Sequence, residues 1–112
     1  MGNKLIVLWV TRDIEAALHM AFMYARNSKV RGWWDEVDLV IWGPSQEVAA
    51  NNEIIQEELK VMQHVGVKVK ACIACADRYG VAEKLRSLNI EVVSMGPILS
   101  EELQNGVKVI TI

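Results

Sequence analysis

The chain has 112 residues, of which 52% are hydrophobic and 23% charged, with a formal net charge of −2. This length and balance exclude a disordered chain and predict a single folded domain over residues 1–112. The weak negative charge, with basic residues scattered along the chain, disfavours nucleic-acid binding, because no basic face would attract phosphate.

The first elements are a strand and a helix. Residues 5–10 form a continuous apolar run, which is typical of a strand covered by helices on both faces. The run is too short to span a membrane. Residues 13–28 then show helical spacing of their apolar side chains, with Asp13 or Thr11 available as the N-cap. A central strand followed by a helix is therefore expected.

The middle of the chain repeats this order. A strand is expected at residues 37–42, stopped by Gly43, Pro44 and Ser45, where the glycine and proline favour a tight turn. Ser45 is expected to cap a helix that ends near Gly66. The next strand, residues 67–73, begins with lysines and becomes wholly apolar.

The last third continues the alternation. A helix is predicted over residues 77–88, ended by Asn89, followed by a strand at 90–95 and a turn at Gly96 and Pro97. A short helix at 99–104 and a strand at 107–112 complete the chain. Strands joined by helices are parallel, so the prediction is an α/β fold, a three-layer α/β/α sandwich around a mostly parallel five-stranded sheet. Loops that follow the strands then share one edge, where open α/β domains bind ligands.

Two thiols lie near that edge. Cys72, between apolar neighbours in a strand, is interpreted as a small core residue. Cys75 is expected after the strand, at the entrance to a helix, where backbone N–H groups favour a thiolate. Asp77 opposes that effect, and Arg12 could support it. Cys75 is therefore the candidate catalytic residue.

Several kinds of cysteine chemistry fit less well. A cysteine hydrolase needs a base beside the thiol, but His19 is expected on the outer side of its helix and His64 at the opposite edge. Two thiols without a convergent histidine are an incomplete zinc set, so no metal site and no cofactor is predicted. A thioredoxin-like pair has this C-x-x-C spacing but straddles a helix start, whereas Cys72 is expected inside a strand.

Residues 69–81 (VKACIACADRYGV), together with VVSMG at 92–96 and WGPS at 42–45, resemble the DsrE-like (DsrE/DsrF/DsrH) superfamily. The resemblance implies a small cytoplasmic α/β protein with sheet order 4-3-2-1-5 that assembles into dimers, trimers or hexamers. It also implies a sulfur-relay role, as a sulfur carrier more than as a sulfurtransferase-like enzyme acting alone, in which Cys75 carries a persulfide between a sulfur donor protein and an acceptor protein.

Two other functions stay open. A non-catalytic module could bind a small anionic or nucleotide-like ligand in a pocket framed by Arg12, Ser45 and Tyr79. The remaining candidate ligand-binding residues at this edge are Gly43, Pro44, Asp77 and Gly96. Alternatively, the chain could be a structural oligomer subunit. The hydrophobic surplus favours a homo-oligomer, with Trp33 and Trp34 as the first choice for subunit contact.

Overall fold

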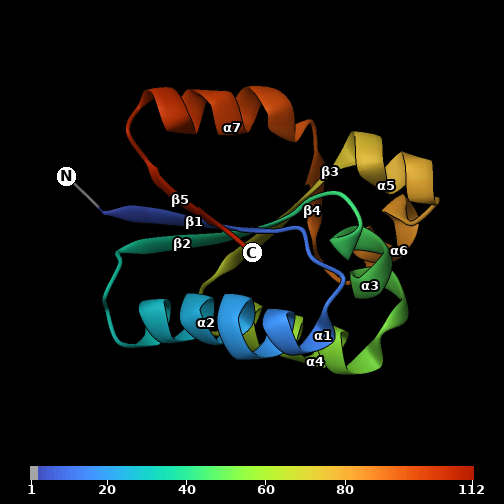
Figure 1. Ribbon diagram of the computed structural model, residues 1–112, viewed down its shortest axis with the longest axis horizontal. Coiled ribbons are helices and arrows are strands. Elements are labelled where there is room, and N and C mark those ends of the chain that lie inside the picture. Colours follow the sequence, from blue (N-terminus) through green and yellow to red (C-terminus); the bar gives the residue numbers. More distant parts are fainter. Residues whose placement is uncertain (1–2) are drawn as a thin grey trace.

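Five parallel strands organise residues 3–112, the part of the chain that the computed structural model describes (Figure 1). The strands are β1 (Lys4–Trp9), β2 (Glu36–Ile41), β3 (Lys68–Cys72), β4 (Glu91–Val93) and β5 (Lys108–Thr111). Their order is β4-β3-β2-β1-β5, and all four pairings are parallel. The predicted fold class and the order 4-3-2-1-5 are thus confirmed.

Helices connect every pair of successive strands. The helical segments are α1 (Ile14–Ala16), η1 (Ala17–Phe22), α2 (Met23–Val30), α3 (Ser45–Asn51), α4 (Glu53–His64), α5 (Ile73–Tyr79), α6 (Ala82–Ser87) and α7 (Met95–Gln104). The segment η1 is a π-helical stretch inside the first long helix. As predicted, Asp13 caps this helix, because its side chain accepts a hydrogen bond from the Ala16 N–H at 2.9 Å.

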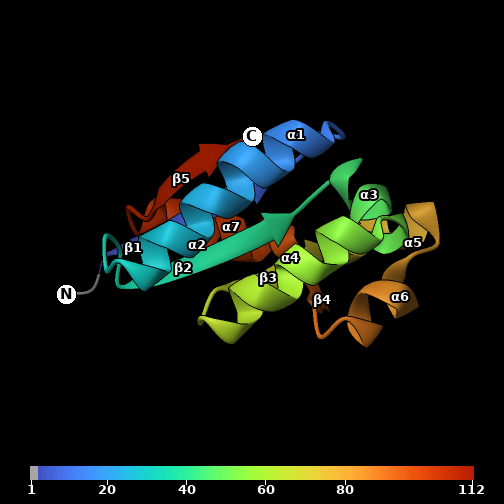
Figure 2. The same ribbon diagram turned by 90° about the horizontal axis from the view of Figure 1, so that it is seen from below.

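The two faces of the sheet are covered unequally. Figure 1 shows α7 alone on one side, with α1, α2 and α4 on the other, and Figure 2 shows α5 and α6 at one end of the molecule. Alternate residues of β1 follow this division: Leu5, Val7 and Trp9 join the larger apolar cluster, and Ile6 faces α7. The central strand β2 is buried at every residue after Glu36.

Charged side chains replace apolar ones at the amino half of the α7 face. The Asp38 carboxylate, only 4% exposed, lies 3.3 Å from the Lys4 ammonium and 3.4 Å from the Lys70 ammonium. Lys4 also reaches Glu102 of α7 at 3.2 Å. Ion pairing therefore links three neighbouring strands and holds α7 to the sheet.

The second predicted helix was wrong in one respect, because two helices replace it. Asn52 has extended backbone angles, φ −116° and ψ 115°, and its side chain accepts a hydrogen bond from the Ile55 N–H. An asparagine in this geometry begins a new helix. The prediction that Ser45 caps a helix was also wrong: Pro44 is the N-cap, and the Ser45 hydroxyl donates to backbone carbonyls instead.

The predicted helix at 77–88 was wrong in both its start and its continuity. The chain forms α5 from Ile73 and α6 from Ala82, separated by Gly80, whose φ of +68° suits a residue without a Cβ. Gly96 and Pro97 form the first turn of α7 and not a loop before it, since proline needs no N–H partner there. Asn89 has the predicted left-handed conformation, with φ +61°. Within residues 3–112, none of the helices combines the length and apolar character needed to cross a membrane.

Candidate functional site

Cys75 lies in the first turn of α5, at the carboxyl edge of the sheet. It is the third residue of that helix, and its side chain is half-buried. Cys75 was expected at the entrance to a helix and lies there, but the helix begins earlier than predicted, because the chain turns into α5 directly after the last residue of β3. The helix extends the apolar run of β3, so a thiol near the strand end is presented from a rigid element.

Cys72 is the last residue of β3 and also the N-cap of α5. Its side chain is 5% exposed and packs on the α7 face with Ile6, Val40 and Met95. The core interpretation agrees with this burial. Cys72 lies in a strand, as predicted, but it is the last residue of that strand, so the two thiols are the N-cap and the third residue of one helix.

Gln46 fixes the backbone at this point. Its side chain is fully buried, and Nε2 donates hydrogen bonds of 3.0 Å to the carbonyl oxygens of Ile41 and Cys72. These carbonyls end β2 and β3, so one amide holds both strand ends beside α3. The opposite amide atom, Oε1, is buried without a hydrogen-bond partner among the described residues. Sequence reasoning missed Gln46 because its partners are backbone atoms, which leave no side-chain motif.

The turn after β2 supports the same edge. The buried hydroxyl of Ser45 donates to the carbonyl of Trp9 at 2.6 Å and to that of Trp42 at 3.1 Å. Gly43 has φ +72°, and a Cβ there would come 3.3 Å from Cγ1 of Val10. Pro44 follows as the N-cap of α3. These three candidate residues shape the backbone, and the Ser45 hydroxyl is committed to it.

Arg12 and Tyr79 meet at the outer side of this edge. The Arg12 guanidinium donates to the Glu47 carboxylate at 2.7 Å, and its Cζ lies 5.8 Å from the centre of the Tyr79 ring. The hydrogen bond from Arg12 to Glu47 raises the pKa of the guanidinium. Asp77 is exposed on α5, one helix position before Arg78. The structure thus brings Arg12 and Tyr79 together, whereas the Ser45 side chain is buried against backbone carbonyls and Gly96 lies on α7.

Metal or hydrolase chemistry has no support from the histidines. His19 and His64 are both exposed, on η1 and at the end of α4. Over residues 3–112, no three His, Cys, Asp or Glu side chains gather in a way that could hold a metal ion. The chemistry available at this edge is therefore that of a partly accessible thiol, held beside a second thiol.

Two cavities bear on the predicted ligand pocket. One of about 360 Å³ lies beside Arg12 and is lined by Arg12, Ile14, Glu47, Val48, Asn51 and Asn52.

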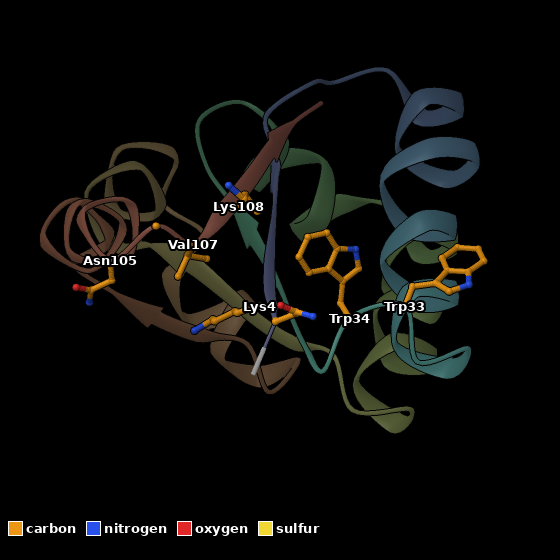
Figure 3. A pocket seen from close by; sticks show the side chains of 8 residues that line it. Lys4, Trp33, Trp34, Asn105, Val107 and Lys108 are labelled. Atoms are coloured by element: carbon orange, nitrogen blue, oxygen red, sulfur yellow. The ribbon is translucent and has the colours of Figure 1, made fainter. Parts of the chain in front are cut away.

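Another of about 410 Å³ lies at the opposite edge, between Lys4, Lys108 and the indole of Trp34 (Figure 3). Trp34 is half-buried and its indole N–H donates to the Tyr24 hydroxyl, whereas Trp33 is 53% exposed. The two tryptophans therefore differ in role.

Comparison with known proteins gives a family and a fold. The model of the DsrE/DsrF-like family matches residues 10–112. A solved structure of a conserved protein of unknown function from Bacteroides thetaiotaomicron is 39% identical, with a TM-score of 0.95 over 98% of this chain and 95% of that one. No curated protein matches the chain.

More distant structures share the fold alone. The YchN protein from E. coli superposes with a TM-score of 0.77 at 17% identity, over the full length of both chains. A protein of unknown function from Methanobacterium thermoautotrophicum superposes with a TM-score of 0.65 at 12% identity, over 98% of this chain and 99% of that one. The arrangement of strands and helices is therefore retained at identities too low to carry a function.

Proposed function

Since the chain belongs to the DsrE/DsrF-like family, we propose that it works in sulfur relay, with Cys75 accepting a sulfur atom as a persulfide and passing it to a partner protein. The observation that carries this proposal is the half-buried thiol of Cys75 in the first turn of α5. A thiol must be accessible to accept sulfur from a donor, and Cys72, at 5% exposure, is not.

The surroundings of Cys75 favour an anionic sulfur. The first N–H groups of a helix have no acceptor within that helix, and the Cys72 side chain makes no capping hydrogen bond to them. Backbone amides at residues 73–75 are thus available to a thiolate or persulfide anion.

The relay requires that sulfur be held on one identifiable atom. Incubation with sodium polysulfide, desalting and intact-mass spectrometry should show one added sulfur per chain, mapped to Cys75 by peptide analysis. Cys75→Ser should show none, while its circular dichroism spectrum stays that of the native chain. A sulfur adduct that persists in Cys75→Ser, or an unmodified native chain, would contradict the proposal.

A ligand-binding module is the second candidate, favoured by the contact between Arg12 and Tyr79 and by the cavity of about 360 Å³ beside Arg12. A guanidinium can bind a small anion, which here would take the place of the Glu47 carboxylate at 2.7 Å. Binding of an anionic nucleotide such as ADP, measured by isothermal titration calorimetry and lost in Arg12→Ala, would support this function. Binding that survives Arg12→Ala would argue against this site.

The relay would operate on a cytoplasmic homo-oligomer. A reducing compartment keeps both thiols free to react. Exposed apolar side chains supply surface for subunit contact, and Trp33 is the largest of them, with Arg31 stacked 5.9 Å from its ring centre. Arginine and tryptophan are the residue types enriched in protein interfaces. This surface lies at the sheet edge opposite Cys75, so assembly through it would leave the thiol open.

A further inference from the structure

Cys72 and Cys75 form a C-x-x-C pair whose placement differs from that of two independent cysteines. Cys72 is the N-cap of α5, with φ −80° and ψ 122°, and Cys75 is the third residue of that helix. The side chain of an N-cap residue and that of the third helical residue lie over one another, which is the geometry of a capping box. Both thiols therefore belong to the same turn of backbone.

The distance between such positions is compatible with a disulfide after a small movement. Side chains at the N-cap and at the third helical residue come close enough to interact around one turn. A disulfide needs a Cβ separation of about 3.5–4.5 Å. Closing the pair thus requires a rotation of the Cys72 side chain out of its apolar contacts. Both cysteines are free in the structure.

Resting on the proposed function, we infer that Cys72 is the resolving thiol for a persulfide on Cys75 and releases its sulfur as sulfide. The Cys72 thiolate attacks the inner sulfur of the Cys75 persulfide. A disulfide forms between the two cysteines, the persulfide S–S bond breaks, and hydrosulfide leaves with the bonding electron pair. The proton of the Cys72 thiol ends on the hydrosulfide or in solvent.

The electrons balance without an external oxidant. The outer sulfur gains two electrons as it becomes sulfide, and the two cysteine sulfurs together lose two as they form the disulfide. A low-molecular-weight thiol then restores both cysteines, forming its own disulfide. Sulfur on Cys75 therefore has two fates: transfer to an acceptor protein that meets the exposed side, or release when Cys72 reaches it from the buried side.

The contacts of Cys72 explain why release would be slower than transfer. Its sulfur is packed with Ile6, Val40 and Met95, which raises the barrier to rotation, and its carbonyl is held by Gln46 at 3.0 Å. The backbone of the pair is thereby fixed while one side chain must move. When an acceptor protein binds soon after loading, the outer sulfur is transferred to it. When no acceptor binds, Cys72 releases that sulfur as sulfide.

The experiment follows persulfide-loaded protein over time by intact-mass spectrometry, with sulfide measured by the methylene-blue assay. The native chain should lose its added sulfur, release one sulfide per chain, and become two hydrogens lighter than the reduced protein. Cys72→Ala should keep the persulfide and release sulfide at least about tenfold more slowly, because an intramolecular attack has been removed. Cys72→Ser is the second variant, in case alanine disturbs the fold.

A parallel arm separates this inference from the proposed function. Glutathione disulfide replaces polysulfide, and the Cys72–Cys75 disulfide is sought as the two-hydrogen loss in the native chain. If polysulfide adds no sulfur to Cys72→Ala, which cannot discharge a persulfide, but the disulfide forms in the native chain, the relay fails and the pairing of the thiols stands. If Cys75 holds sulfur in both the native chain and Cys72→Ala with equal lifetimes, the resolving role of Cys72 is overturned and the relay stands.

Discussion

The ion cluster at the amino half of the sheet gives a sharp prediction for stability. Asp38→Asn keeps the shape of the side chain and removes its charge. Two ammonium groups, Lys4 and Lys70, then lose a carboxylate at 3.3 and 3.4 Å, and Lys70 has no other carboxylate within 4 Å among the described residues. Lys4 keeps Glu102. The substitution therefore leaves one ammonium group without an ionic partner.

The magnitude follows from burial. Removing one partner of a fully buried ion pair costs about 3–5 kcal/mol, and an exposed pair contributes about 0–1. The side chain of Asp38 is 4% exposed, but those of Lys4 and Lys70 are 20% and 17% exposed, so the freed ammonium groups regain some water. We expect the free energy of unfolding to fall by about 2–3 kcal/mol. With a urea slope near 1.5 kcal/mol per molar, the midpoint should fall by about 1.5 M.

Urea titration followed by tryptophan fluorescence measures this change, with Glu57→Gln as the matched control. The Glu57 carboxylate is 3.5 Å from the Lys60 ammonium, but its side chain is 72% exposed, so its loss should change stability by less than about 0.5 kcal/mol. A double-mutant cycle of Asp38→Asn with Lys70→Met should give a coupling of about 1–2 kcal/mol. Equal effects of Asp38→Asn and Glu57→Gln would refute the reasoning.

Two further predictions concern pH and assembly. Partial burial acts to lower the pKa of Lys4, but the carboxylates of Asp38 and Glu102 outweigh it, so the pKa is raised above its usual value. The stabilising contribution of Lys4 should be complete below about pH 10.4 and lost as pH rises through its folded pKa. Over this pH range, the urea midpoint should fall less in Lys4→Met than in the native chain. Equal falls of the midpoint in both chains would contradict this prediction. Trp33→Ser should move the elution volume in size-exclusion chromatography toward that of a monomer with little change in stability, since Trp33 is 53% exposed. Trp34→Ser should also destabilise the chain, because its indole donates to Tyr24. An unchanged elution volume for Trp33→Ser would exclude Trp33 from the subunit contact.

The fold could be predicted because its signals are local and redundant. Each apolar run flanked by a turn residue gave a strand, and the parallel order followed from the helices between them. Helix boundaries were harder. The apolar stripe of Val48, Ile55, Leu59 and Met62 continues across Asn52, so the break is invisible to periodicity, although asparagine is a strong N-cap residue. The strand at 67–73 and the helix after it share one apolar run, so their boundary depended on a tertiary contact from Gln46.

The site could be predicted only in outline. Parallel topology places Arg12, Ser45 and Cys75 at one edge, and the sequence indicates this. Their exposure was not predictable, because it depends on which backbone groups compete for each side chain. The Ser45 hydroxyl is taken by the carbonyls of Trp9 and Trp42, and the Arg12 guanidinium by Glu47. Two of these contacts, from Ser45 to Trp9 and from Arg12 to Glu47, join residues 36 and 35 positions apart and leave no periodic signal.

The unequal cover of the sheet gives the two thiols different access. The Cys72 side chain lies on the face that α7 covers, where Met95 at the start of that helix packs with it, and the bridge between Lys4 and Glu102 holds the far part of α7 to the sheet. A protein that approaches the carboxyl edge can reach Cys75 but not Cys72. We therefore expect a reaction of Cys72 to follow a reaction of Cys75, because the Cys72 side chain is buried on the face that α7 covers and the Cys75 side chain is partly exposed.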